Sequence, residues 1–89
     1  MEAKMNSNHN ILDGAIRQGI NLMRNPNLSE QQFNIWLEYS KNLLGLASKN
    51  NALMINYHTV IYAATNRNLM PYQKLSMCLQ YLISIQYTL

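Results

Sequence analysis

The second half of this 89-residue sequence has very little charge. Between Asn50 and Leu89 the only charged residues are Arg67 and Lys74, and neither is acidic, whereas a typical stretch of that length carries about ten. A small monomer exposes a large share of its surface and normally covers that surface with charged side chains. We therefore expect this half of the chain to be covered by a second copy or by another protein.

Cysteine and acidic residues are also scarce. The single cysteine, Cys78, excludes an internal disulfide and a thiolate metal cluster. The net charge of +3 reflects four acidic residues against seven basic ones, without the dense basic stripe that is typical of nucleic-acid binders. No apolar run reaches the roughly 20 residues that span a bilayer, and the N-terminus does not resemble a signal peptide. These absences predict a cytoplasmic protein that does not associate with membranes.

Asparagine and tyrosine, in contrast, are abundant, with thirteen and six residues. Both are encoded by A/T-rich codons, so the composition predicts an AT-rich genome. A low-GC bacterium, or a phage or other mobile element that lives in one, fits this bias.

The pattern of apolar residues predicts an all-α fold, because it shows helical spacing and no strand-like alternation. We expect a compact bundle of about four helices, at approximately 10–24, 29–48, 52–66 and 71–88. Residues 1–9 are expected to be disordered, and residues 10–89 to form a single helical domain. Ser29 and Gln32 have the spacing of a capping box, and Pro71 suits the first position of a helix. Asn50 or Asn51 is expected to end the second helix in the left-handed conformation.

Two of the expected helices have more apolar surface than one contact requires. The helix over 29–48 carries a broad apolar face around Trp36 and a smaller ridge formed by Ile35, Tyr39 and Leu46, which predicts contacts from two directions. The helix over 52–66 is apolar nearly all round. That pattern is typical of a central helix or of an interface helix.

The sequence contains no recognisable catalytic or metal-binding constellation. His58 has no carboxylate or nucleophile tied to it by a motif, so we expect a structural, hydrogen-bonded histidine. Cys78 lies on the apolar stripe of the last helix, where a cysteine usually acts as a small hydrophobic residue. We therefore predict a protein that is not an enzyme and that needs no cofactor or metal ion.

The first functional hypothesis is a small helical protein–protein interaction module that forms a homodimer through its last two helices. Tyrosine is favoured at interfaces because it buries a large area and keeps a polar tip. The candidate contact residues are therefore Tyr57, Tyr62, Tyr81 and Ile85. An additional, unidentified protein partner is expected, as for a phage- or plasmid-encoded regulator or inhibitor of a host protein.

Two other hypotheses remain open. In the first, the last two helices form a helix-turn-helix-like unit that binds nucleic acid through Arg67, Tyr72, Gln73 and Lys74. In the second, a small polar ligand binds at an oligomer interface lined by tyrosine and asparagine, and Arg67 supplies a charge. The first ranks below the interaction module because it has few side chains for reading bases and contacting phosphates, and the second ranks below both.

Overall fold

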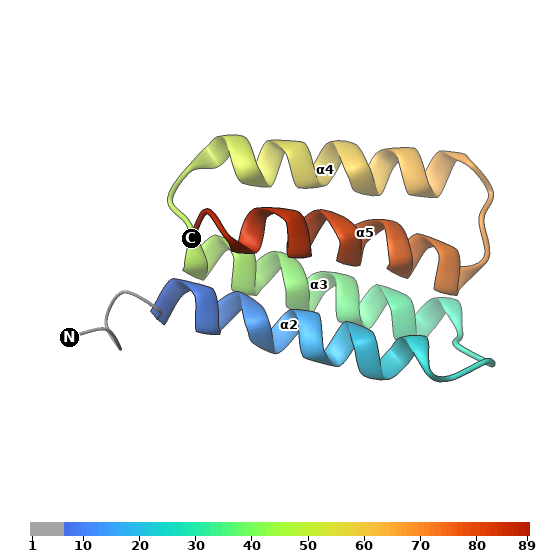
Figure 1. The fold of residues 1–89 in the computed structure, drawn as a ribbon. Helices are drawn as coiled ribbons and strands as arrows, with labels where there is room; N and C mark the ends of the chain where they lie inside the picture. Colours follow the sequence, from blue (N-terminus) through green and yellow to red (C-terminus); the bar gives the residue numbers. More distant parts are fainter. Residues whose placement is uncertain (1–6) are drawn as a thin grey trace.

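The computed structural model describes residues 7–89, with side chains from residue 10 onward. The described chain is an all-α bundle of four helices, as predicted (Figure 1). In chain order they are α2 (Ser7–Met23), α3 (Glu30–Ala47), α4 (Asn51–Asn66) and α5 (Pro71–Gln86). Residues 7–9 were expected to precede the first helix but form its first turn, and the rest of the predicted disordered segment, residues 1–6, lies outside the described residues.

The start of α3 confirms the predicted capping box. The Ser29 hydroxyl accepts a hydrogen bond from the backbone N–H of Gln32 at 3.0 Å. The Gln32 side chain accepts one from the backbone N–H of Ser29, also at 3.0 Å. Leu28 and Phe33, which flank the cap, are both buried, as in a hydrophobic staple. A cap of this kind stabilises a helix by about 1 kcal/mol.

The connections on either side of α4 differ from the expectation. Asn50 has a φ of −81° and caps the start of α4, where its side chain accepts a hydrogen bond from the N–H of Ala52 at 3.0 Å. Among the described residues, it is Asn68 that adopts the left-handed conformation, with a φ of 57°. The prediction for Asn50 or Asn51 is therefore wrong. The connection between α3 and α4 is short, and Asn50 already serves as the cap at the start of α4. The left-handed turn lies instead between α4 and α5.

The four helices are arranged so that α4 is the outermost. Helix α2 packs along both α3 and α5, and α5 also packs along α4. Helices α3 and α4 touch at few places, and no contact between α2 and α4 is found in the part of the chain that the structure describes. In Figure 1, α4 accordingly lies at the edge of the molecule, antiparallel to α5. The bundle is thin, with extents of 43 × 25 × 18 Å, so the described part of the chain gives α4 neighbours on one side only.

The core lies mainly between α2, α3 and α5. Trp36 is 3% exposed, and its indole N–H donates a hydrogen bond to the carbonyl oxygen of Ala15 on α2 at 2.8 Å. The broad face predicted for α3 is confirmed, since most of its residues are buried. The buried hydrophobic residues are Leu12, Ala15, Ile16, Leu28, Phe33, Trp36, Leu37, Leu44, Ala47, Tyr57, Ala64, Leu75, Cys78, Leu79, Leu82 and Ile85.

The smaller apolar ridge on α3 is not covered by the other described residues. Ile35, Tyr39 and Leu46 are all exposed, so the predicted contact from a second direction does not occur within the described residues. Within the same residues, no helix is long and apolar enough to cross a bilayer.

Gly19 allows α2 to approach α5 closely. A Cβ atom at Gly19 would lie 2.6 Å from the Cδ2 atom of Leu79, which is closer than van der Waals contact permits. At Gly45 on α3, by comparison, the nearest atom to such a Cβ is the Met54 methyl carbon, at 3.8 Å. The first glycine is therefore required by packing, and the second is not.

We expect Gly19→Ala to destabilise the protein by about 1–2 kcal/mol, because the overpacking against Leu79 exceeds the roughly 1 kcal/mol gained in helix propensity. Gly45→Ala is the matched control and should stabilise the protein by up to about 1 kcal/mol. Urea unfolding followed by circular dichroism measures both changes. Equal stability of the two variants would show that α2 and α5 are not in close contact at Gly19.

Candidate interaction surface

The inner side of α4 is attached to the bundle by a buried hydrogen-bond relay. Tyr57 is fully buried, and its hydroxyl lies 2.6 Å from the hydroxyl oxygen of Ser40 on α3. Ser40 donates in turn to the carbonyl oxygen of Leu37 at 2.7 Å, so Tyr57 is the donor to Ser40. Burial raises the pKa of the Tyr57 phenol well above its ordinary value. The relay satisfies two buried hydroxyl groups and fixes the rotation of α4 about its own axis.

A second attachment joins α4 to α5. The rings of Tyr57 and Tyr81 stack with their centroids 5.6 Å apart and their planes 10° from parallel. The Tyr81 hydroxyl donates to the carbonyl oxygen of Leu53 at 2.7 Å. Burial also raises the pKa of Tyr81, and a hydrogen bond with Asn56 partly opposes this rise. These contacts determine which side of α4 points away from the bundle.

The outward side of α4 carries an exposed stripe of residues with alternating spacings of three and four. Ile55 is 62% exposed and Tyr62 is 70% exposed. Both lie opposite the buried residues Tyr57 and Ala64, since positions three or four apart share one face of a helix. The whole outer stripe consists of Ala52, Ile55, Thr59, Tyr62 and Asn66, all of them exposed.

No charged residue lies anywhere on α4. The ion pairs among the described residues join Asp13 to Arg17, Glu38 to Lys41, and Glu30 to Lys74. These pairs lie on α2, on α3 and between α3 and α5. The outer face of α4 is therefore an apolar and amide-rich surface with charge only beyond its two ends, at Lys49 and Arg67.

The structure separates the four predicted interface residues. Tyr62 is exposed on the outer stripe, as an interface residue must be. Tyr57 and Ile85, however, are buried in the core of the single chain, and Tyr81 is partly buried against Tyr57 and Leu53. Tyr57 and Ile85 are therefore corrected to core residues, because the thin core uses them for its own packing. Ile55 and Thr59 take their place on the accessible face.

The four residues of the nucleic-acid hypothesis have mainly structural contacts. The Gln73 side chain accepts a hydrogen bond from the backbone N–H of Met70 at 2.9 Å and so caps α5. Lys74 forms an ion pair with Glu30, and its ammonium lies 5.2 Å from the centroid of the Phe33 ring. Arg67, Tyr72 and Gln73 are exposed, and Lys74 is partly buried.

The orientation of α4 and α5 also disagrees with a helix-turn-helix. The two helices of that motif cross at a steep angle, so that the second can enter the major groove. In Figure 1, α4 and α5 instead lie side by side as an antiparallel hairpin. The arrangement of α4 and α5 therefore does not support the nucleic-acid hypothesis, and two of its four side chains already have structural contacts.

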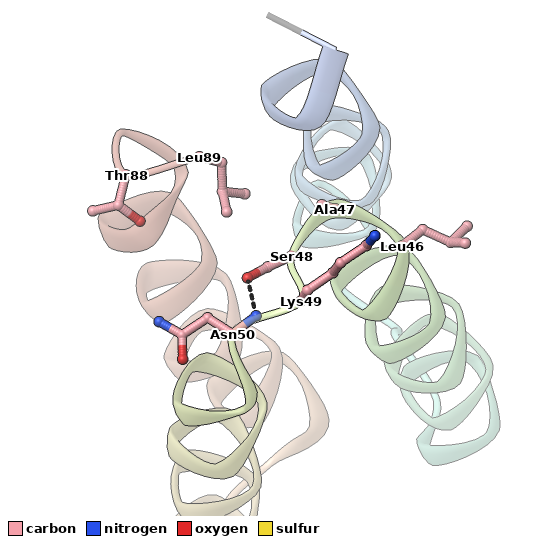
Figure 2. Close-up of a pocket in the computed structure, with 7 residues that line it drawn as sticks. All are labelled: Leu46, Ala47, Ser48, Lys49, Asn50, Thr88 and Leu89. Atoms are coloured by element: carbon pink, nitrogen blue, oxygen red, sulfur yellow. Dashed lines mark hydrogen bonds between the residues drawn. The ribbon is translucent and has the colours of Figure 1, made fainter. Parts of the chain in front are cut away.

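A hollow of about 410 Å³ lies between the α3–α4 connection and the end of the chain (Figure 2). Of its polar side chains, Ser48, Asn50 and Thr88 already form hydrogen bonds with the backbone, which leaves Lys49. The Ser48 hydroxyl accepts a hydrogen bond from the N–H of Asn50 at 3.1 Å, and the Asn50 side chain caps α4. Arg67, which was expected to serve a small-ligand site, lies at the opposite end of α4. The hollow therefore offers no converging set of polar groups for a ligand.

The two candidate reactive side chains lie in very different surroundings. Cys78 is fully buried, and burial raises the pKa of its thiol to about 12, so the thiol stays protonated at neutral pH. We expected His58 to be a structural, hydrogen-bonded histidine, but it is exposed on α4 and forms no side-chain hydrogen bond with the described residues. Among the described residues, no group of three metal-ligating side chains comes together.

In comparisons with known proteins, no family model, no curated sequence and no solved structure matches this chain. Its function is therefore inferred from its own geometry. The outer stripe of α4 was not identified from the sequence as a set. Its spacing of three and four residues was the available signal, but the apolar residues on the other sides of the same helix obscured it.

Proposed function

We propose that this protein is a small, non-enzymatic helical interaction module that associates with itself through the outer stripe of α4. The observation that carries this proposal is that α4 exposes Ile55 and Tyr62 on a face without any charge. Helix α4 also lies at the edge of a thin bundle and has no neighbour on that side among the described residues. Surfaces of this composition are typical of protein contacts, where aromatic residues are enriched and charges depleted.

A second copy is the partner that this face suits best. Each chain has a net charge of +3, so two copies repel each other wherever their charged surfaces meet. If two copies meet through α4, no like charges come into contact, and the same self-complementary surface is covered on both chains. A strongly charged partner, in contrast, would gain no complementary charge from this face.

Sedimentation equilibrium on the full chain tests the proposal. We expect the mass to rise from 10.3 kDa toward twice that value as the concentration increases from about 1 µM to about 500 µM. Tyr62→Glu should keep the chain monomeric, because it would bury a carboxylate against an apolar surface. High salt should not dissociate the dimer, since no ion pair holds it together.

Tyr72→Glu is the matched control for this experiment. Tyr72 is half-exposed in the first turn of α5, where a carboxylate is compatible with the helix dipole. We expect this variant to dimerise like the original chain. A dimer that Tyr62→Glu leaves intact would place the contact on another face, and a mass of 10.3 kDa throughout would contradict self-association.

The proposal leaves a separate surface for another protein. Ile35 and Tyr39 line, with Gln18 and Trp36, an open groove of about 350 Å³ between α2 and α3. Together with Leu46, Ile35 and Tyr39 form the ridge that the described residues leave uncovered. Binding of a further protein there, as expected of a regulator or inhibitor, would remain possible in the dimer, because the ridge does not lie on α4.

A further inference from the structure

We infer that the two copies pair with their α4 helices antiparallel, with the two-fold axis beside Thr59, so that Tyr62 of each copy covers Ile55 of the other. This inference depends on the proposed self-association and specifies its geometry. It follows from the spacing, the sizes and the neutral flanks of the outer stripe.

The spacing of the stripe is that of a coiled-coil seam. Its five members, Ala52, Ile55, Thr59, Tyr62 and Asn66, follow one another at intervals of three, four, three and four. Alternation of this kind keeps one narrow line of side chains facing a partner helix over two heptads. Every member of the stripe is exposed, so this seam has no partner among the described residues. A helix of the same kind is therefore the shape that fits it.

The sizes of the side chains select the antiparallel arrangement. Ile55 and Tyr62 lie on either side of Thr59, so reversing one helix about that point brings each tyrosine onto an isoleucine. Ala52, which is small, then faces the region of Asn66 at the other end. A parallel pair would instead place the two Tyr62 side chains against each other and the two isoleucines in a separate layer. Antiparallel packing also aligns the helix dipoles favourably.

The positions that flank the seam distinguish a second copy from a different helix. In coiled coils these positions usually carry charges that determine which partner binds. Here they are Asn56, His58, Ala63 and Thr65, none of which carries a carboxylate, an ammonium or a guanidinium group. Such flanks neither repel an identical helix nor attract a charged one. The second copy is thus accepted without any charge penalty.

The expected affinity is modest. Helix α4 has 16 residues and is therefore about 24 Å long. Two such helices bury on the order of 1,000 Å² in total, at the low end of specific interfaces. We therefore expect a dissociation constant in the micromolar range, and the experiments below should be carried out at about 100 µM or above.

Cross-linking tests whether the axis passes beside Thr59. Thr59→Cys should be joined to its own copy by a short bifunctional maleimide, because a residue beside a two-fold axis meets itself. Tyr72→Cys, on α5 and off the stripe, is the control and should not be joined. The original chain should not react either, since Cys78 is fully buried.

A paired charge substitution tests the antiparallel register. In the double variant Ile55→Lys with Tyr62→Glu, each new lysine faces a new glutamate of the other copy, so the dimer lost in Tyr62→Glu should be largely recovered. A parallel pair would place lysine against lysine and glutamate against glutamate, and the double variant would stay monomeric. Sedimentation at low salt, where the new ion pairs are least screened, measures the difference.

The outcomes separate this inference from the proposed function. If the original chain dimerises and Tyr62→Glu does not, the proposed function stands. If, in that case, Thr59→Cys is not cross-linked or the double variant stays monomeric, the antiparallel register is overturned. If the original chain is monomeric at every concentration, both the function and the register are overturned. Cross-linking together with recovery supports both.

Discussion

Trp36→Ala is expected to lower the free energy of unfolding by about 3–5 kcal/mol, because it empties the centre of the core. Trp36 is 3% exposed, and its ring lies 6.3 Å from that of Phe33, centroid to centroid. The change also removes the hydrogen bond from the indole to Ala15 on α2. A domain of this length is stabilised by only about 4–13 kcal/mol in total. The variant should therefore be close to unfolding, as measured by urea titration and circular dichroism.

Trp36→Phe is the matched control. It keeps an aromatic ring in the core and loses mainly the indole N–H and some volume, so we expect a cost of about 1–2 kcal/mol. Trp36 is the only tryptophan in the chain, which makes its fluorescence a direct report on burial. Emission typical of a water-exposed indole in the folded protein would show that the α2–α3 contact is not formed as described.

The helices that could be predicted well are those with local signals. Ser29 and Gln32 act within four residues of each other, and Pro71 acts at its own position, so neither depends on the rest of the fold. The buried face of α3 was also readable, because its broad apolar side contrasts with positions such as Asn34 and Glu38. Such patterns indicate where a helix begins and which side it buries.

The orientation of α4 could not be predicted in the same way. Its apolar residues surround the helix, so no single face stands out as the buried one. The deciding contact joins Tyr57 to Ser40 across 17 positions of sequence, and no local pattern announces it. Tyr57 and Tyr62 are therefore similar in the sequence, although one is a core residue and the other lies on the surface.

Two of the residues assigned to nucleic-acid binding, Gln73 and Lys74, have structural contacts that the sequence does not reveal, for a related reason. Gln73 and Lys74 at the start of a helix resemble groups that contact bases and phosphates. Their partners are the N–H of Met70 and the carboxylate of Glu30. The second partner lies 44 positions away, so the sequence alone gives no sign that Lys74 is already paired.

The contact between α4 and the rest of the bundle has a consequence at alkaline pH. Burial raises the pKa of Cys78 from 9.0 to about 12 and that of Tyr57 above its ordinary value of 10.0. Above pH 9 the unfolded chain therefore releases protons that the folded chain retains. This release stabilises the unfolded state relative to the folded state. The stability that these two groups provide is complete below pH 9. It decreases as the pH rises toward their folded pKa values.

We expect the free energy of unfolding to fall by about 1.4 kcal/mol per pH unit from Cys78 above pH 9, and by a similar amount from Tyr57 above pH 10, or about 4 kcal/mol by pH 11. Urea titrations at a series of pH values measure this slope. The double variant Tyr57→Phe with Cys78→Ala will be less stable near neutral pH, but its slope should be clearly smaller, because neither buried group can ionise. Comparing slopes removes the packing cost of the substitutions. An equal slope in both proteins would show that Tyr57 and Cys78 are accessible to water, and that α4 is not attached to the bundle through the buried relay.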